Sequence, residues 1–449
     1  MRQPTYMASA LSPSVTQVER ISPCEMGQTT YRARPQSTGN IRTTMSLRIG
    51  RTWHALLDHY RKPRVLGLDL LRITASLSII IHHGNAAGAL GRNWLASVFG
   101  SDGYLAVDIF FVLSGWLLTR QVLRMRGAFA STAGFALTFW LRRWARTIPP
   151  YWAVLTAIFL LGPARLNPLA LPHALSVRDA VVHALFLQTL LPPNLFAVTW
   201  SLVTEEWFYL LLPFVILLAS RVRNWRGLIA FGVLALLLPT VVRTILLLSS
   251  ADWDAITRQP VARFEGLVVG AMLAAASVTL PAWQHTVLKW RHLLFALGVP
   301  LIVVVLAAGT SDSAWFRIGG LLAFSVGIGL LMPLLSQLRW WASAPTVAVV
   351  AIAYLSELTY PLYLVHTLVP RISWVHTQGP MRLVYALGSI AILFAVASAL
   401  HLGVERPFLA WRDRHPVGVR SWKEPVEASQ PGRDIYPIAP PAVVPVPSV

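Results

Sequence analysis

Long apolar runs separated by short polar connections recur along the chain from residue 67 to residue 403. A helix that crosses a bilayer needs about 20 consecutive, mostly apolar residues, within a range of roughly 17–25. Ten runs have this length, at 67–87, 103–121, 147–163, 203–220, 227–249, 261–280, 292–310, 317–336, 346–369 and 383–403. An eleventh apolar stretch, 179–191, is shorter and is followed by two prolines. The pattern predicts an all-α polytopic membrane protein with about ten transmembrane helices.

The basic residues decide whether the stretch 179–191 crosses the membrane, because cytoplasmic loops collect Lys and Arg. If the basic N-terminal arm is cytoplasmic, so is the second connection, which holds Arg120, Arg124, Arg126, Arg142, Arg143 and Arg146. A crossing at 179–191 would then place the basic turn 221–226 and the loop 289–291 outside, whereas without it both lie inside. We therefore expect ten spans with both termini cytoplasmic, and 179–191 as a re-entrant or interfacial helix.

Composition supports the membrane assignment. The chain is 55% hydrophobic and 13% charged, about half the charged content of a soluble protein. In so apolar a chain we interpret the net charge of +19 as a topology signal, and we expect no nucleic acid partner. The single cysteine, Cys24, lies in the polar arm, so no internal disulfide forms. We expect a multi-pass protein of the cell (cytoplasmic or inner) membrane.

Three regions follow from these patterns. Residues 1–64 are polar and arginine-rich, and we expect a disordered basic arm, in which Met45 is an alternative start. Residues 65–410 form the transmembrane domain. Residues 411–449 include a proline-rich end and are expected to form a disordered cytoplasmic tail. We expect no fused soluble domain.

The first span carries an arginine and two histidines in the stretch RITASLSIIIHHG. A charge at mid-bilayer costs about 2.5–3.5 kcal/mol even on lenient scales. Arg72 and His83 are eleven residues apart, so they share a helix face about 16 Å apart along the axis. Asp69, three residues before Arg72, is placed to neutralise it. We expect Arg72 near the cytoplasmic mouth and His83 toward the outer leaflet, where a neutral imidazole acts as a general base.

A plainer interpretation stays open for this span. Asp69 and Arg72 then form a structural ion pair, and the histidines cap the span at the interface. We favour this interpretation for His82, which points about 100° away from His83.

Other intramembrane polar groups lie in the next spans. Asp108 has no structural role unless it finds a partner from another span, whereas Ser114 and Gly115 favour close helix packing. Arg143 and Arg146 share a face at the cytoplasmic edge. They fit a phosphate clamp and a plain topology signal equally well.

The fourth span opens with TWSLVTEEWFYLLLP. Ser201 and Glu205 are one turn apart, so they either cap this helix or line one site. The topology puts this end on the same side as His83, which allows a pairing of His83 with Glu205. Further polar groups recur at Arg263, Glu265, Tyr360, His366 and Glu405. No metal-ligand spacing, phosphate-loop pattern or serine nucleophile elbow occurs, and we expect no metal.

Five ordered segments resemble motifs of the acyltransferase 3 family of membrane-bound O-acyltransferases. They are GLDLLRITASLSIIIHH (67–83), GYLAVDIFFVLSGWLLT (103–119), RRWARTIPPYW (142–152), TWSLVTEEWFYLLLP (199–213) and LTYPLYLVH (358–366). The first is similar to the family's LDGLRGxAxxxVxxxH, whose arginine and histidine match Arg72 and His83 rather than His82. The resemblance covers the whole membrane region, from residue 67 to residue 407.

The resemblance implies transfer of an acyl group, commonly acetyl, from acyl-CoA to a hydroxyl of a sugar-containing acceptor such as a surface polysaccharide. It implies His83 as the general base, with Arg72 and Glu205 completing the catalytic set, and no bound cofactor. It implies that Arg143 and Arg146 meet the phosphates of the donor. The other residues expected to support this site are Asp69, Asp108, Trp200, Ser201, Tyr360 and His366.

Some relatives of this kind carry a fused extracytoplasmic domain that completes transfer. The short chain after Pro407 leads us to expect completion within the membrane core or by a separate partner. A transporter is the alternative, because intramembrane charges also mark solute and proton paths. Transporters often show internal repeats with broken helices, and no such repeat is evident here. A structural membrane subunit is a third possibility, against which the complete polar set argues.

Overall fold

The structure is a computed structural model, and it describes residues 59–60, 64–86, 103–126, 132–165, 176–191, 196–222, 225–308, 313–340, 345–368 and 382–414. The chain divides into two units, Met1–Ala55 and Leu56–Val449. All described residues belong to the second unit. Most of the predicted arm and tail therefore lies outside the described residues.

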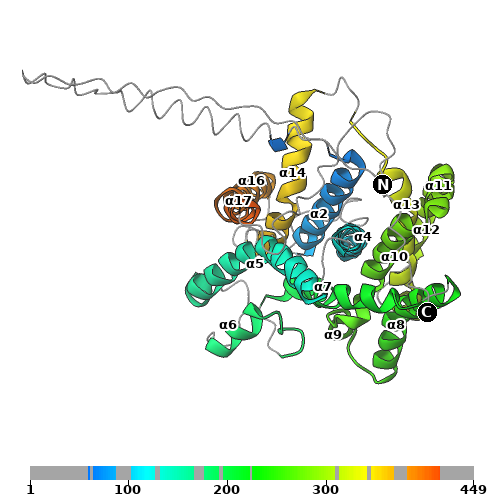
Figure 1. Ribbon diagram of the computed structural model, residues 1–449. Helices are drawn as coiled ribbons and strands as arrows, with labels where there is room; N and C mark the ends of the chain where they lie inside the picture. Colours follow the sequence, from blue (N-terminus) through cyan, green and yellow to red (C-terminus); the bar gives the residue numbers. More distant parts are fainter. Residues whose placement is uncertain are drawn as a thin grey trace, which may run out of the picture. The chain divides into compact units, whose positions relative to one another are not determined.

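The described part of the second unit is helical, which confirms the all-α class (Figure 1). Its longer helices are α2 (Leu66–Ala86), α4 (Ala106–Arg126), α5 (Thr132–Arg165), α7 (Trp200–Ala219), α8 (Trp225–Leu248), α10 (Glu265–Thr279), α12 (Arg291–Ala308), α13 (Leu321–Leu335), α14 (Thr346–Val365) and α16 (Arg382–Leu400). The shorter ones are α6 (Val177–Ala184), α9 (Trp253–Thr257), α11 (Pro281–Lys289) and α17 (Arg406–Arg414).

Seven of the described helical segments are long and apolar enough to cross a membrane, which makes this a multi-pass membrane protein. They are Leu66–Gly84, Gly103–Met125, Trp200–Ala219, Arg226–Leu248, Phe316–Leu335, Thr346–Val365 and Ala386–Arg414. The pair α10 and α11, bent by 117°, gives an eighth if it forms one broken span. The predicted count of ten thus exceeds what length and composition establish, and ten spans with cytoplasmic termini stay a prediction.

Helix α6 occupies part of the stretch 179–191. Its eight residues are about 12 Å long, less than half of a hydrocarbon core of about 30 Å. A capping box of Ser176 and Asp179 fixes its start. This helix is too short to cross the membrane alone, as expected, while its interfacial or re-entrant placement stays a prediction.

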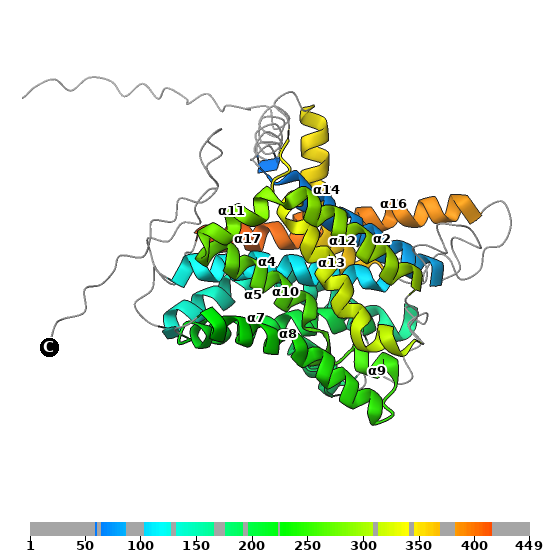
Figure 2. The same cartoon turned by 90° about the vertical axis from the view of Figure 1, so that its right-hand side faces the viewer.

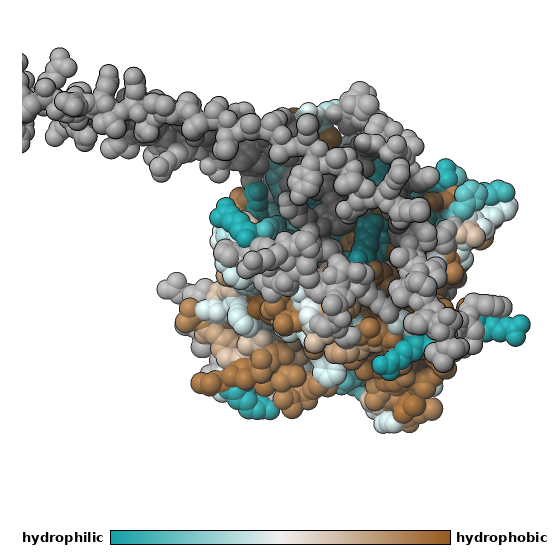
Figure 3. Space-filling view, in the orientation of Figure 1, coloured by the Kyte–Doolittle hydropathy of each residue, from teal (hydrophilic) through white to brown (hydrophobic). Residues whose placement is uncertain are grey.

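The surface of α8 is apolar where it faces outward. Leu234 is 69% exposed, and Ile245 and Leu238 are exposed on the same helix. Figure 3 shows apolar side chains gathered over this part of the surface. A large exposed apolar surface costs free energy in water, so α8 is suited to contact with lipid.

Helix α4 occupies the centre of the bundle, where it packs against α2, α7 and α10. Figure 1 looks along α4 and α16, and Figure 2 shows the same helices lengthwise. The contact with α10 depends on glycine. A Cβ at Gly115 would lie 2.0 Å from the carbonyl oxygen of Leu267, and one at Gly270 would lie 2.1 Å from that of Val112. The packing role predicted for Gly115 is confirmed.

Two buried ion pairs lie within the bundle, one between α4 and the 3-10 turn Val261–Arg263 that precedes α10, and one between α8 and α10. Arg263 donates to Asp108 at 2.7 Å, and both side chains are at most 1% exposed. Arg243 pairs with Glu265 in an equally buried position. Asp108 therefore has a partner outside its own helix, which is the condition that the sequence set for a structural role. The guanidinium of Arg263 also lies over the ring of Trp200, 5.1 Å from its centroid.

The ends of the transmembrane domain differ from the predicted boundaries. Tyr60, which belongs to the predicted disordered arm, is 1% exposed, and its hydroxyl lies 3.1 Å from Nε2 of His401. Helix α17 continues to Arg414, beyond the predicted end at residue 410. Packing against the bundle orders these residues, because burial of Tyr60 compensates the conformational entropy lost on fixing the chain.

Candidate functional site

A cavity of about 430 Å³ lies among α2, α4, α5, α7 and α14. On α4 its lining runs from Val107 to Arg124, seventeen residues apart, which is about 26 Å along the helix axis. This length is close to the thickness of the hydrocarbon core. The lining of the cavity therefore follows α4 over a length comparable to the thickness of the hydrocarbon core.

One end of the cavity is strongly cationic. Five arginines line it, Arg72, Arg120, Arg124, Arg143 and Arg146. Among the lining residues that the structure describes, Glu205 is the only carboxylate. Helix α4 returns antiparallel to α2, because its start, at Gly103, contacts His82 at the end of α2. Arg120 and Arg124 therefore lie, like Arg72, on the side of the cavity away from His82.

Glu205 and Glu206 have different surroundings although they are adjacent. Glu205 accepts hydrogen bonds from the hydroxyls of Ser114 at 2.7 Å and Tyr209 at 2.6 Å. The guanidinium of Arg143 donates to the Tyr209 hydroxyl at 2.6 Å and lies 3.9 Å from Glu205. The structure thus joins the predicted donor-binding Arg143 to the predicted catalytic Glu205.

Glu206 points away from the cavity into the bundle and is 5% exposed. It accepts from the hydroxyl of Thr147 and from Nε1 of Trp144, each at 3.0 Å. Because a protein donor meets each of its oxygens, Glu206 holds α7 against α5. We therefore expect Glu206 to stabilise the fold and not to take part in the chemistry.

Ser201 does not cap α7, because the N-cap is Thr199 and its side chain makes no capping bond. The hydroxyl of Ser201 instead bonds the hydroxyl of Tyr363 from α14. Tyr363 also donates to the carbonyl of Val198 at 2.5 Å. The capping interpretation is therefore wrong. Ser201 and Glu205 both line the cavity, as the alternative interpretation predicted.

The histidines lie beyond the end of the cavity formed by Ser201 and Tyr363. The ring of His83 lies 4.9 Å from that of His366 and 5.0 Å from that of His82. Nδ1 of His366 lies 2.6 Å from the carbonyl oxygen of Tyr363, and its Nε2 is buried without a partner in the described part of the chain. Glu205 was the expected neighbour of His83, but it accepts hydrogen bonds from Ser114 and Tyr209. The ring next to His83 is that of His366.

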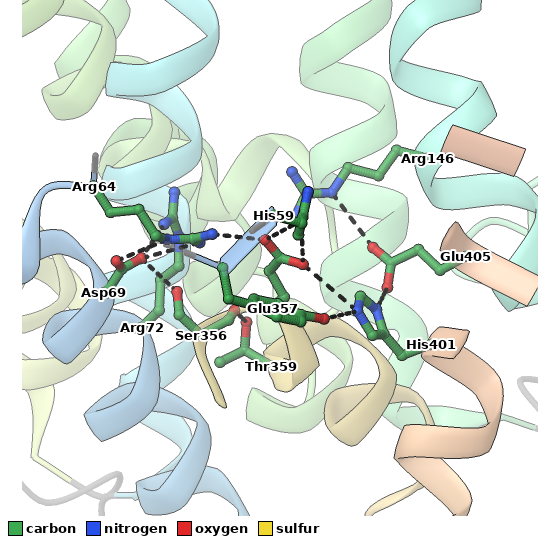
Figure 4. A network of polar contacts seen from close by, with 11 residues as sticks. His59, Arg64, Asp69, Arg72, Arg146, Ser356, Glu357, Thr359, His401 and Glu405 are labelled. Atoms are coloured by element: carbon green, nitrogen blue, oxygen red, sulfur yellow. Dashed lines mark hydrogen bonds and ion pairs between the residues drawn. The ribbon is translucent and has the colours of Figure 1, made fainter. Parts of the chain in front are cut away.

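Asp69 connects Arg72 to a second arginine (Figure 4). It accepts from Arg72 at 3.3 Å, from Arg64 at 3.1 Å and from Ser356 at 2.6 Å. Arg64 also donates to Glu357 at 2.6 Å. Burial by itself would lower the pKa of Arg64, but the carboxylates of Asp69 and Glu357 outweigh it and raise that pKa above its usual value. The expected Asp69–Arg72 ion pair is confirmed, and it belongs to a larger network.

The network continues from Glu357 to the far side of the cavity (Figure 4). His401 lies 3.6 Å from Glu357 and 2.8 Å from Glu405. Glu405 lies 3.7 Å from Nε of Arg146, a side chain that is 44% exposed. A chain of ion pairs and hydrogen bonds through Asp69, Arg64, Glu357, His401 and Glu405 thus links Arg72 and Arg146, which lie on two walls of the cavity.

The predicted site residues divide into two groups. Those that line the cavity are Arg72, Arg143, Arg146, Ser201, Glu205 and Tyr360. Those that lie outside its lining are Asp69, His83, Asp108, Trp200 and His366. Trp200 contacts Phe111 of α4, with ring centroids 6.1 Å apart.

Several lining residues lie outside the predicted site. Arg120 and Arg124 were assigned to topology alone, and Ser114 to packing alone. Tyr363, three residues after Tyr360, shares a helix face with it, and that spacing was the available signal.

The helices and the cavity define a multi-pass membrane protein with an arginine-rich internal cavity. Residues 65–402 match the profile of the acyltransferase 3 family, described as an acyltransferase domain. The chain belongs to this family. The family prediction is confirmed.

The chain is similar to curated proteins of two bacterial species. It is 27% identical over 392 residues to an inferred O-acetyltransferase of Staphylococcus aureus strain MRSA252, covering 79% of this chain and 60% of the relative. It is 28% identical over 295 residues, 61% of this chain and 43% of the relative, to a Bacillus subtilis strain 168 protein named, by inference, peptidoglycan O-acetyltransferase YrhL. It is 35% identical over 177 residues, 36% of this chain and 26% of the relative, to O-acetyltransferase OatA of Staphylococcus aureus strain NCTC 8325.

The chain thus spans about 60% of the length of the first of these relatives. No solved structure matches it.

Proposed function

We propose that this protein is an O-acetyltransferase that moves an acetyl group from acyl-CoA to a hydroxyl of an envelope polysaccharide. The observation that carries the proposal is the cavity, which has five arginines at one end and the hydroxyls of Ser201 and Tyr363 at the other. A donor with phosphates at one end and a thioester at the other suits such a cavity. Guanidinium groups bind phosphate oxygens in bidentate fashion.

The orientation of the donor follows from charge. The arginine end belongs to the side on which the positive-inside rule places basic residues, and a CoA thioester is a cytoplasmic metabolite. Its thioester would then reach toward Ser201, Tyr363 and the histidines. The donor crosses only part of the membrane in this arrangement, because the acyl group alone has to reach the far end.

In the transfer step, His83 acts as the general base. Its imidazole takes the proton of the acceptor hydroxyl while the oxygen attacks the thioester carbonyl. The tetrahedral intermediate collapses, the carbon–sulfur bond breaks, and the thiolate leaves and takes up a proton. The ester forms on the acceptor, and His83 returns its proton to solvent. Arg72 and Glu205 maintain the charge balance of the cavity along the donor.

The acceptor proposed first is a cell-wall glycan. One relative is named for peptidoglycan O-acetylation, and a hydroxyl of such a glycan would approach from the histidine end. Other surface polysaccharides present the same chemistry.

Mass spectrometry of envelope glycans tests the proposal. A deletion strain is compared with strains restored by wild type, by His83→Ala and by His82→Ala. We expect a glycan lighter by one acetyl group in the deletion and in His83→Ala, and the acetylated glycan with wild type and His82→Ala. If His83→Ala reaches the membrane in normal amount and restores acetylation, the assignment of His83 is wrong. If deletion changes no acylated species, the function is wrong.

A further inference from the structure

The hydroxyl of Tyr209 lies between the guanidinium of Arg143 and the carboxylate of Glu205. It accepts a hydrogen bond from Nη2 of Arg143 at 2.6 Å and donates one to Oε2 of Glu205 at 2.6 Å. These two charged atoms are themselves 3.9 Å apart. Tyr209 is fully buried behind the cavity wall and was not among the predicted site residues. One uncharged hydroxyl therefore bridges the arginine predicted to bind the donor and the glutamate predicted to take part in catalysis.

The distance between Arg143 and Glu205 is long for two opposite charges inside a protein. A direct hydrogen bond between a guanidinium and a carboxylate is about 2.7–2.9 Å long, so the 3.9 Å found here is about 1 Å longer. The attraction between the two charges is strong where the dielectric constant is low. Without the hydroxyl between them, the two groups would therefore form a direct ion pair.

The position of Tyr209 is fixed by contacts on both sides. Its backbone carbonyl accepts a hydrogen bond from Nε1 of Trp140 at 3.0 Å, and Trp140 lies three residues before Arg143 on α5. The guanidinium of Arg143 lies over the ring of Tyr209, 4.5 Å from its centroid, which is a cation–π contact. The other carboxylate oxygen of Glu205 accepts from the hydroxyl of Ser114 at 2.7 Å. Packing thus holds the hydroxyl in place between the two charges.

We propose that Tyr209 is a positioning residue whose hydroxyl keeps Arg143 from pairing directly with Glu205, so that the guanidinium stays available to a phosphate of the donor. The identity of this ligand rests on the proposed function. Arg143 lines the cavity, and 17% of its side chain is exposed. A phosphate that meets a guanidinium already paired with a carboxylate has to displace that carboxylate first, because both anions compete for the same N–H groups. The spacing that Tyr209 maintains therefore favours binding of the donor.

Binding of coenzyme A tests the spacing without any acyl transfer. The full chain is placed in nanodiscs of phosphatidylcholine, and affinity is measured by calorimetry for wild type, Tyr209→Phe, Glu205→Gln and the double variant Tyr209→Phe/Glu205→Gln. Tyr151→Phe is the matched control, because it also removes a buried hydroxyl, one that donates to the carbonyl of His183 at 2.9 Å. A second measurement needs no ligand. It is the rate at which phenylglyoxal modifies Arg143, followed by mass spectrometry of the peptides.

We expect Tyr209→Phe to weaken binding of coenzyme A by about tenfold or more, because Arg143 then pairs directly with Glu205. Modification of Arg143 should slow in the same variant, since the direct ion pair shields the guanidinium. The double variant lacks the same hydroxyl but should recover both the affinity and the modification rate, because a neutral amide holds a guanidinium less strongly than a carboxylate does. Glu205→Gln should bind at least as tightly as wild type, and Tyr151→Phe should match wild type in both measurements.

Two results would overturn the inference. One is wild-type affinity for coenzyme A in Tyr209→Phe. The other is a double variant that binds as weakly as Tyr209→Phe, which would mean that the hydroxyl serves the fold or contacts the ligand itself. Because modification of Arg143 is measured without ligand, it separates this inference from the proposed function. A protein that shows the expected modification rates but binds no coenzyme A would refute the proposed donor and support the role of Tyr209 as a spacer.

Discussion

The imidazole rings of His83 and His366 lie 4.9 Å apart, so the end of α2 meets the end of α14 beyond the cavity. Nδ1 of His366 faces a carbonyl oxygen, which only accepts, so this nitrogen carries the proton. Nε2 is left as an acceptor beside His83. A fixed tautomer next to a general base is an arrangement that can orient the base and receive its proton.

This relationship predicts that His366 positions His83. His366→Asn should lower acetyl transfer by about tenfold, less than the 10²–10⁴-fold that a general base supplies. The pH–rate profile measured on membranes should also change, because a different group then faces His83. The control is His82→Asn, whose ring contacts His83 but lies on another face. An unchanged pH profile with reduced protein in the membrane would mean that His366 serves only the fold.

The adjacent glutamates give a matched pair. Glu205→Gln removes the negative charge beside Arg143 while its hydroxyl partners can reorient. We expect a changed KM for the donor and normal stability. Glu206→Gln puts an amide NH₂ where Thr147 or Trp144 donates, and a buried unpaired donor costs about 1–3 kcal/mol.

Thermal unfolding in detergent and donor kinetics separate the two roles of these glutamates. If Glu205→Gln and Glu206→Gln lowered the unfolding temperature equally, Glu205 would not differ from Glu206 in its contribution to the fold, and the two roles proposed here would be wrong.

The buried pair of Asp108 and Arg263 predicts a large loss of stability on breaking it. Asp108→Ala leaves the arginine charge uncompensated in the bundle, which typically costs about 3–5 kcal/mol. The double variant Asp108→Leu/Arg263→Met should recover much of that loss, because two apolar side chains leave no buried charge. Size-exclusion profiles and unfolding temperatures of the purified variants measure this. Additive losses in the double variant would show that the two residues do not stabilise the fold as a pair.

The packing of α4 on α10 predicts a strong difference between two glycines. Gly270→Ala puts a Cβ 2.1 Å from a backbone oxygen of Val112, so the helices have to separate, at a cost of about 1–3 kcal/mol. Gly388→Ala on α16 meets nothing within 4 Å and should be neutral or slightly stabilising. Unfolding temperatures of the two variants give the comparison. Equal temperatures would mean that α4 and α10 tolerate a wider spacing.

Apolar run length and five ordered motifs are local properties of the chain, so the helical membrane class and the family follow from the sequence alone. The sequence also predicted the pair Asp69–Arg72, whose spacing of three is set by the helix alone.

Only the tertiary structure decided which side chains face one another across helices. In the structure Asp108 pairs with Arg263. The partner of Glu205 is Arg143 and not His83, and the ring beside His83 is that of His366. The structure also shows that the α4 arginines line the cavity. The physical reason is that helix periodicity fixes the face of a residue on its own helix, whereas the rotation and depth of one helix against another follow from packing of the whole bundle.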